Sequence, residues 1–431
     1  MAVGNALAAG SAPRQFGPLM PPPEPRLHPA HQIWRLLPAA PRRRLLAHGT
    51  ALLAPRPDRA PPAVAPGAIV AGEVSRASGL GEGARLFHAA LGLLGAPAWC
   101  IDIGSLVPGE AADLLPPAPP AALPAGVPLL AFVNGPMLPL AALRLGRGVM
   151  RGRRVIGHWV WELASAPESW AAGLGFVHEI WVPSAFTAAA LAPLAARRGV
   201  PIRIVPYPVA ARPPAPAALD RTAFGLPDDA LVTLVSASLA SSVARKNPEA
   251  AIRAHRAAFG ERPDRVLVLK LGHSAHYRDD LAALAAAAEG AGNIRFETRT
   301  LPTADSLALT ACSDIVLSLH RSEGFGLVPA EAMLLGKPVV ATAWSGNMDF
   351  MDADSAALVG YRLIPVADPR GTYDIPGAAW AEPDIAEAAV HLTRLADSAE
   401  ARAALGARAK AAAGAKLGVQ PLADALAALA G

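Results

Sequence analysis

The stretch at residues 314–342, DIVLSLHRSEGFGLVPAEAMLLGKPVVAT, constrains the fold of this chain more than any other part of the sequence. It begins with an apolar run that is typical of a buried strand, and a polar loop with two glycines follows. Residues 327–335 predict a helix that Gly336 ends, and the apolar run at 339–342 predicts a second strand. Strand, loop, helix and strand form a βαβ unit, and ligands of open α/β sheets bind at the carboxyl ends of the strands.

The loop of this unit has features of an anion-binding site. Gly324 and Gly326 carry no Cβ, so the backbone can approach a ligand closely. The amides of residues 325–328 point outward at a helix start, where the dipole favours an anion such as a diphosphate. Glu331 lies about one turn into the helix, so its carboxylate would accept hydrogen bonds from neutral hydroxyls, such as the two hydroxyls of a ribose.

Two glutamates, Glu323 and Glu331, bracket this loop with seven residues between them. This pattern resembles the E-x7-E motif of retaining glycosyltransferases with the GT-B fold. The segments HRSEGFGL, GKPVVAT and SGNMDF are similar to the corresponding sequences of glycosyltransferase family 4, the bacterial group 1 type. The alternative is an ordinary helix with surface glutamates, which would leave the loop glycines without a function.

The resemblance covers residues 67–398 and implies an α/β chain of the GT-B fold, with two Rossmann-like domains whose parallel sheets face a cleft. Strands alternate with helices throughout this region, as this fold class requires. We expect four segments: a proline-rich, disordered or loosely packed extension at 1–65, an acceptor-binding domain at 66–212, a nucleotide-sugar-binding domain at 213–398 and a helical tail at 399–431. In this fold the tail usually crosses back to the N-terminal domain.

On the donor side, the segment SASLASSVARKNP at 236–248 resembles the loop in which a lysine pairs with the diphosphate. Lys246 takes that position, with Arg245 beside it, whereas Ser241 stands near the place where many members have a further arginine. The positive end of the helix dipole lies at a helix start, so cations there are unfavourable by themselves. This mismatch favours a bound anion at that position. The resemblance implies a donor-binding set of Arg245, Lys246, Gly324, Phe325, Gly326, Leu327, Val328, Glu331, Ser345, Gly346 and Asn347. It implies a catalytic set of Glu323, His158 and Lys246.

On the acceptor side, RVIGHWVWEL at 154–163 resembles the G-Y-W-x-W-E-L segment of a bacterial subgroup, with His158 where tyrosine is more usual. Trp159 would offer a platform for a sugar face, and Glu162 would bind a hydroxyl. The alternative is that Trp159 and His158 are core residues. Gly81, in the glycine-rich loop SGLGEGAR, would face the same cleft.

Two other functions stay open. Gly79, Gly81 and Ala84 fit G-x-G-x-x-A after a predicted strand, and Asp102 follows at about the distance of a ribose-binding acid, which is typical of an NAD-dependent oxidoreductase. The second alternative is a non-catalytic sugar-binding protein of the same fold.

Composition and charge limit the partners. Lysine and arginine number 39 against 35 acids, a net charge of +4, and no basic stripe interleaves with aromatic residues, so we expect no nucleic acid. No metal-ligand spacing occurs, so no metal and no cofactor are expected. The reaction that the resemblance implies is metal-independent transfer of a hexose, with retention, from a GDP- or UDP-sugar such as GDP-mannose to a saccharide or lipid-linked acceptor. We expect a cytoplasmic protein, and arginine clusters would allow peripheral contact at the inner face of the membrane.

Overall fold

The computed structural model describes residue 45, residues 49–104 and residues 123–430 of the chain. Most of the proline-rich extension predicted at 1–65 therefore lies outside the described residues.

The described end of that extension packs against the first domain, which differs from the expected loose packing. The guanidinium carbon of Arg56 lies 5.2 Å from the centre of the Phe176 ring. The Asp58 carboxylate accepts a hydrogen bond from the Gly152 amide at 2.7 Å, and the Asp58 carbonyl lies 2.8 Å from Nε2 of His178. Proline-rich composition did not predict these contacts, because they depend on single side chains that meet distant parts of the chain.

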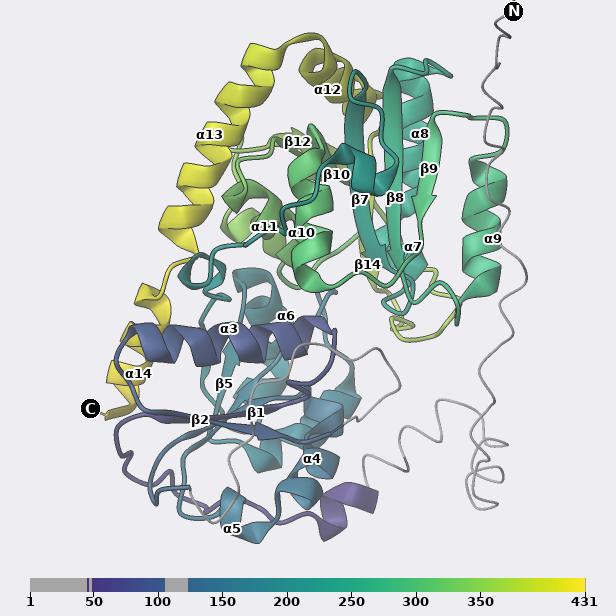
Figure 1. Cartoon of the computed structure of the whole chain (residues 1–431). Coiled ribbons are helices and arrows are strands. Elements are labelled where there is room, and N and C mark those ends of the chain that lie inside the picture. Colours follow the sequence, from purple (N-terminus) through teal and green to yellow (C-terminus); the bar gives the residue numbers. More distant parts are fainter. Residues whose placement is uncertain (1–44, 46–48, 105–122, 431) are drawn as a thin grey trace, which may run out of the picture. The chain divides into compact units, whose positions relative to one another are not determined.

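In the first domain, the described residues form a sheet of six parallel strands in the order β2-β1-β3-β4-β5-β6 (Figure 1). The strands are β1 (Ala68–Gly72), β2 (Ala98–Asp102), β3 (Leu129–Phe132), β4 (Val155–His158), β5 (Glu179–Val182) and β6 (Ile202–Ile204). The α-helices are α3 (Gly79–Leu93), α4 (Leu138–Leu145), α5 (Arg147–Met150) and α6 (Ala185–Ala196), and 3₁₀ helices span Gly135–Met137, Glu168–Phe176 and Val209–Ala211. Alternation along β1 puts Val70 against α3 and Ile69 against α4, so helices cover both faces.

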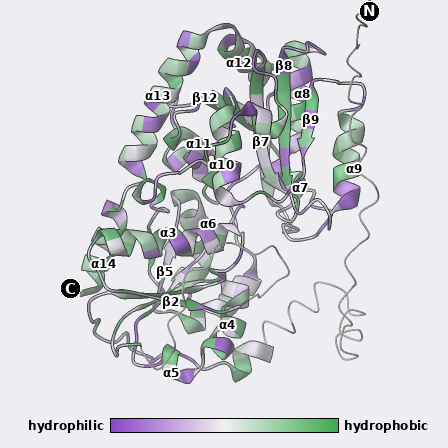
Figure 2. Cartoon of the chain, in the orientation of Figure 1, coloured by the Kyte–Doolittle hydropathy of each residue, from purple (hydrophilic) through white to green (hydrophobic). Residues whose placement is uncertain are grey.

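The second domain contains another six-stranded parallel sheet within residues 231–359, all of which the structure describes, in the order β12-β11-β10-β7-β8-β9. Its strands are β7 (Leu231–Ser238), β8 (Arg265–Gly272), β9 (Ile294–Glu297), β10 (Ile315–Ser318), β11 (Val339–Thr342) and β12 (Ala357–Val359). Its helices are α7 (Val243–Lys246), α8 (Pro248–Phe259), α9 (Arg278–Ala287), α10 (Thr303–Cys312), α11 (Leu327–Leu334) and α12 (Ile385–Asp397), with 3₁₀ helices at Arg221–Phe224 and Gly346–Asp349. Figure 2 shows hydrophobic colours along β8, as expected of a strand buried between helical layers.

A β-hairpin follows the second sheet, where the sequence predicts only one long strand over 356–364. The chain leaves β12 at Gly360 and forms β13 (Tyr361–Pro365), which pairs antiparallel with β14 (Ala379–Pro383). The residues between these strands, 366–378, are called the hairpin loop below.

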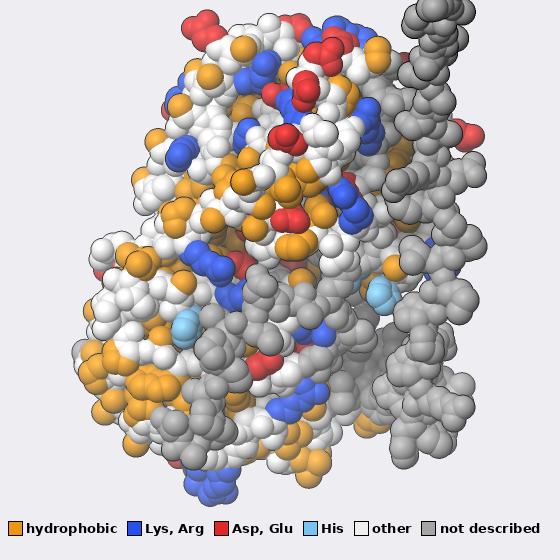
Figure 3. Space-filling view, in the orientation of Figure 1, with side chains coloured by type: hydrophobic (Ala, Val, Ile, Leu, Met, Phe, Trp, Pro, Cys, Tyr) orange, Lys and Arg blue, Asp and Glu red, His pale blue; other side chains and the backbone are white. Residues whose placement is uncertain are grey.

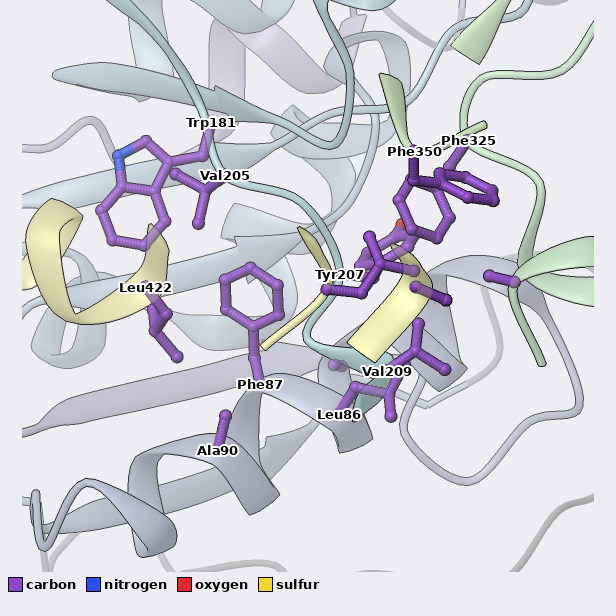
Figure 4. Close-up of a cluster of buried hydrophobic side chains, with 14 of the residues drawn as sticks. Leu86, Phe87, Ala90, Trp181, Val205, Tyr207, Val209, Phe325, Phe350 and Leu422 are labelled. Carbon is purple, nitrogen blue, oxygen red and sulfur yellow. The ribbon is translucent and has the colours of Figure 1, made fainter. Parts of the chain in front are cut away.

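The C-terminal tail forms two helices, α13 (Ala399–Lys416) and α14 (Gln420–Ala430). Helix α13 packs on α11 at small residues: a Cβ on Gly406 would lie 2.1 Å from the carbonyl oxygen of Gly336. Leu422 of α14 lies in the same buried cluster as Phe87 of α3 (Figure 4). The tail therefore crosses from the second domain to the first, as the resemblance implies.

One hydrophobic core is shared by the two domains. Tyr207, at the end of the first domain, packs its ring 5.0 Å from Phe325 of the second, and Phe325 packs 5.1 Å from Phe350 (Figure 4). On the other side Tyr207 lies close to Gly83, where a Cβ would come within 2.2 Å of the ring. The loop that contains Phe325 is therefore held against the first domain by apolar packing.

No helix in the described part of the chain is long and apolar enough to cross a membrane. On the face of the molecule shown in Figure 3, basic and acidic side chains are interspersed rather than gathered in one stripe.

Candidate active site

The loop between β10 and α11 leads into a helix start that, in the described part of the chain, no side chain caps. Gly326, the residue before the helix, has a φ of +101°, a conformation that favours glycine. The amides of Leu327 and Val328 at the first turn are therefore suited to an anion, as the sequence predicts. The Phe325 side chain points elsewhere, into the shared core, so only its backbone can serve a ligand here.

Glu323 meets both predicted cations of the donor loop. Lys246 Nζ lies 2.5 Å from its Oε1, and Arg245 donates to its Oε2 at 3.2 Å. Burial alone would raise the pKa of the Glu323 carboxyl, but Lys246 and Arg245 overcome this effect and lower the pKa to about 2. Glu323 is therefore ionised at any pH at which the protein would act, and it holds the two cations in place.

Arg245 is the most strongly held cation of this cluster. Its side chain is 2% exposed. It donates to the Ser322 carbonyl at 2.7 Å and to the Ser241 hydroxyl at 2.6 Å. Burial opposes its charge, but neighbouring Tyr373, Glu323 and Glu162 raise the pKa of the guanidinium above its ordinary value. Ser241, the position where the resemblance leaves a phosphate contact in doubt, thus orients Arg245.

The predicted donor residues Ser345, Gly346 and Asn347 support the glutamate loop. The Ser345 hydroxyl accepts from the Glu323 amide at 2.8 Å, and the Gly346 amide donates to the Glu323 carbonyl at 2.9 Å. A Cβ on Gly346 would lie 2.3 Å from the carbonyl oxygen of Gly324, so glycine is required for this approach. Asn347 is fully buried and donates to the Thr342 carbonyl. These residues position the loop, and their contact with a sugar stays a prediction.

The first domain meets this loop through the segment at 154–163. A Cβ on Gly324 would lie 2.4 Å from Cγ1 of Val160, and the Ser184 hydroxyl donates to the Gly324 carbonyl at 2.6 Å. Glu162 then lies beside the cations, with its Oε1 3.8 Å from Nη2 of Arg245. The structure therefore brings Glu162 together with Glu323, Arg245 and Lys246.

The structure also places Tyr373, which the sequence analysis did not single out, in this cluster. Its ring packs 5.3 Å from the Trp161 ring, and the guanidinium carbon of Arg245 lies 5.6 Å from its centre. Tyr373 belongs to the hairpin loop, outside any motif, so its sequence context contained no signal.

Three of the predicted residues lie apart from this cluster, in the interior of the first domain. His158 is stacked between Phe132 and Tyr207, with ring centres 4.7 and 5.0 Å away, and burial lowers the pKa of its imidazole to about 3. Trp159 is 1% exposed and packs edge-on against Trp170. Both positions match the alternative that these are core residues.

The third of them, Gly81, lies in the first turn of α3, where its amide donates to the Ser78 hydroxyl. A Cβ there would lie 2.7 Å from the carbonyl oxygens of Glu73 and Arg76, which explains the glycine by local packing. Gly79 is the glycine that faces the second domain, since a Cβ added to it would lie 3.9 Å from Cδ1 of Leu327 on α11.

Glu331 lies on α11, partly buried and away from the cations that hold Glu323. Burial raises the pKa of its carboxyl to about 8, and the nearby carboxylate of Glu82 adds to this effect, while Lys270 opposes it. The two glutamates of the motif therefore have opposite electrostatic environments.

Within the described residues, no group of three or more His, Cys, Asp or Glu side chains is arranged to hold a metal ion. The positive charge of the cluster comes from Arg245 and Lys246.

Comparisons with known proteins follow this geometry. Residues 220–362 match the family model described as "Glycosyl transferases group 1". No curated protein sequence matches the chain significantly.

Solved structures share the fold at low identity. HepE from Anabaena, in complex with UDP-glucose, is 15% identical with a TM-score of 0.59, covering 84% of this chain and 99% of that one. A glycosyltransferase from Rickettsia africae is 12% identical with a TM-score of 0.57, covering 84% and 98%. The α,α-trehalose 6-phosphate synthase from Burkholderia multivorans is 16% identical with a TM-score of 0.51, covering 72% and 73%. Residues 220–362 therefore form a domain of the group 1 glycosyltransferase type, in a chain whose two Rossmann-like domains have the GT-B fold.

Proposed function

We propose that this protein is a retaining, metal-independent hexosyltransferase of family 4 that takes its sugar from a nucleotide-sugar donor. The observation that carries the proposal is the cluster of Arg245, Lys246 and Glu323 beside the uncapped start of α11. Cations and free helix amides at one sheet edge suit a diphosphate, and a neighbouring carboxylate suits the hydroxyls of a sugar.

Charge balance explains how the donor would enter. In the free protein Lys246 and Arg245 are neutralised by Glu323, with Glu162 close to Arg245. A diphosphate brings its own negative charge and competes for Lys246, the more exposed of the two cations, whose side chain is 22% exposed. Glu323 would then be free to accept hydrogen bonds from the transferred sugar. In this exchange Lys246 binds the diphosphate and Glu323 binds the sugar, so both halves of the donor are bound.

For the reaction itself, the leaving diphosphate would be stabilised by Lys246, Arg245 and the first amides of α11. Retention on one face of the sugar requires no protein nucleophile, because the departing phosphate oxygen can take the proton of the acceptor hydroxyl. Glu162 would bind the acceptor on the first-domain side. Roles for His158, Trp159 and Gly81 remain predictions, and any role of His158 would act through packing under the site.

The donor is tested with a panel of nucleotide sugars, scored by thermal stabilisation and by product formation. UDP-glucose comes first, because HepE binds it in a solved structure and a similar structure from E. coli binds UDP-2-fluoro glucose. GDP-mannose is the second candidate. Stabilisation by one donor, together with transfer to a saccharide or lipid-linked acceptor, supports the proposal. Stabilisation without transfer would favour the non-catalytic alternative, and stabilisation by NADH alone would favour the oxidoreductase.

The two motif glutamates are expected to differ in function. Glu331→Ala should weaken binding of both the nucleotide sugar and the free nucleoside diphosphate by roughly 1–3 kcal/mol, because it removes the proposed partner of the ribose hydroxyls. Glu323→Ala should not weaken nucleoside diphosphate binding, because it removes the carboxylate that competes for Lys246, and it should lower the turnover rate, because the proposed partner of Glu323 is the transferred sugar.

Isothermal titration with the diphosphate, beside initial rates with the intact donor, separates these effects. Glu387→Ala serves as the control variant, because the Glu387 side chain on α12 is exposed. Equal losses of diphosphate affinity in both glutamate variants would contradict the division of roles.

Transfer is expected to survive chelation, because the charge of the leaving group is met by Arg245 and Lys246. The rate should be the same in EDTA as after addition of Mg²⁺ or Mn²⁺. Loss of activity in EDTA that either ion restores would show that a metal is required.

Peripheral membrane contact and a cytoplasmic location remain predictions. Co-sedimentation with anionic vesicles tests the first of them.

A further inference from the structure

The first turn of α6, a helix of the first domain, contacts the second domain at the motif loop (Figure 1). Ser184, the residue before the helix, is fully buried and donates its hydroxyl proton to the Gly324 carbonyl at 2.6 Å. The same hydroxyl oxygen accepts from the Thr187 amide at 3.2 Å, as the side chain of a helix N-cap does. The Ala185 amide donates to the Asp349 carboxylate at 2.7 Å, which is a second hydrogen bond between this turn and the second domain.

The same turn also contacts the acceptor-side segment. The Thr187 hydroxyl is fully buried and lies 3.0 Å from the Trp161 carbonyl and 3.4 Å from the Gly324 carbonyl. A hydroxyl has one proton to donate, so Thr187 binds the nearer Trp161 carbonyl, and Ser184 binds that of Gly324. The two hydroxyls therefore hold one carbonyl in each half of the candidate site.

These carbonyls belong to neighbours of the two proposed sugar-binding carboxylates. Gly324 follows Glu323, and Trp161 precedes Glu162. Because a peptide group is planar, a hydrogen bond that fixes its carbonyl also fixes the direction of the chain on both sides of it. One helical turn thus holds the backbone next to both glutamates.

The other anchors of the motif loop come from its own domain. The Glu323 amide donates to the Ser345 hydroxyl at 2.8 Å, and the Glu323 carbonyl accepts from the Gly346 amide at 2.9 Å. Both hydrogen bonds can form whatever the position of the first domain. The hydrogen bond from Ser184 differs from them, because it requires that the two domains be in contact.

We propose that Ser184 and Thr187 are positioning residues for sugar transfer, which set the place of Glu323 relative to Glu162. This inference rests on the proposed function. Ser184 acts on the transferred sugar through Glu323, and Thr187 acts on the acceptor through Glu162. The acceptor hydroxyl and the sugar must meet in a narrow geometry, so a small shift of either glutamate lowers the rate or weakens acceptor binding.

The donor half is tested with Ser184→Ala. We expect kcat to fall roughly tenfold, because Glu323 loses its fixed direction toward the transferred sugar. The Kd for the free nucleoside diphosphate should stay within about threefold of wild type, because its proposed partners, Lys246 and the first amides of α11, belong to the second domain. A wild-type kcat in this variant would overturn the role of Ser184.

The acceptor half is tested with Thr187→Val, which keeps the size of the side chain and the amide that Ser184 caps. The KM for the acceptor should rise roughly tenfold, and kcat at saturating acceptor should change much less. A loss of α6 stability alone would affect both variants in the same way. The same pattern of kcat and acceptor KM in Ser184→Ala and Thr187→Val would therefore overturn the proposal.

Ser398→Ala is the matched control for the loss of a helix cap. Ser398 is the N-cap of α13, where its hydroxyl accepts from the Ala401 amide at 3.0 Å. This variant loses a cap of the same kind, but the hydrogen bond between Ser184 and Gly324 stays intact. It should change neither kcat nor the acceptor KM. A loss of kcat as large as that of Ser184→Ala would overturn the proposal, because it would show that cap loss is sufficient.

Hydrogen exchange provides a readout that needs no activity. The double variant Ser184→Ala/Thr187→Val leaves neither hydroxyl near the Gly324 carbonyl, so the amides of residues 323–328 should exchange roughly threefold faster or more. Ser398→Ala should leave their exchange unchanged. Wild-type exchange in the double variant would overturn the contact on which the proposal rests. Faster exchange in a protein whose wild type transfers no sugar would instead overturn the proposed function while leaving the contact intact.

Discussion

Replacing Arg245 with methionine is expected to reduce sugar transfer roughly 100-fold or more and to lower the unfolding free energy by about 3–5 kcal/mol. Methionine fills much of the same space but removes the cation that faces Glu323 and Glu162. It also leaves the buried Ser322 carbonyl without its donor. The loss of stability therefore follows from unpaired buried groups, and the loss of activity follows from the missing charge at the leaving diphosphate.

Urea unfolding and initial rates measure the two effects separately. Arg253→Met is the control: Arg253 pairs with Glu382 at 3.2 Å, but 47% of its side chain is exposed. Exposed pairs contribute at most about 1 kcal/mol, so this variant should retain both stability and transfer. An Arg245→Met protein with wild-type stability would contradict the buried position of Arg245.

The second large effect is a pH-dependent gain in stability from Glu331→Gln. The folded-state pKa of Glu331 is raised to about 8 from an ordinary value of 4.5, chiefly by burial and then by Glu82. Between these pH values the folded protein holds a proton that the unfolded chain releases, so the unfolding free energy falls as pH rises through this window. Glutamine cannot ionise, and it therefore avoids this loss.

The Tm of Glu331→Gln should equal that of wild type near pH 4.5 and exceed it increasingly up to pH 8. At the upper end the gain is on the order of 2–4 kcal/mol, since one pKa unit corresponds to about 1.4 kcal/mol. Glu323→Gln is the matched control of opposite sign, because its pKa is lowered to about 2 and its ion pairs stabilise the protein at neutral pH. A gain for Glu331→Gln that is the same at about pH 5 and about pH 9 would refute the assignment.

The sequence predicted the parts of this structure that depend on local pattern. Apolar runs bounded by glycine, proline and polar residues predicted the strands of both parallel sheets, because buried strands need such runs. The loop at 323–326 is likewise indicated by local pattern, because it contains two glycines. Gly326 has a positive φ, and Val160 lies close to Gly324, so both positions require glycine. The family resemblance assigned Glu323, Arg245 and Lys246 to one site, but it implied contacts with the donor and not the ion pairs that the three residues form with one another.

The features that the sequence did not predict depend on tertiary contacts. The sequence predicts most of β13 only as the end of one strand at 356–364, and the AWAEP run of β14 is short, contains proline and matches no strand pattern well. Tyr373 acquires its environment only when its loop meets Arg245 and Trp161, which are far away in the sequence. His158 likewise becomes a core residue through Phe132 and Tyr207, and no local signal distinguishes a stacked histidine from a catalytic one.

The shared core has a consequence for how the protein unfolds. Many two-domain proteins melt in separate steps, because few apolar contacts cross the linker. Here Tyr207, Phe325 and Phe350 form a continuous aromatic contact between the domains, and Leu422 of α14 joins the cluster on the first domain. Separating the halves would expose these rings to water, so calorimetry should record one cooperative transition, and neither half is expected to fold as a soluble fragment.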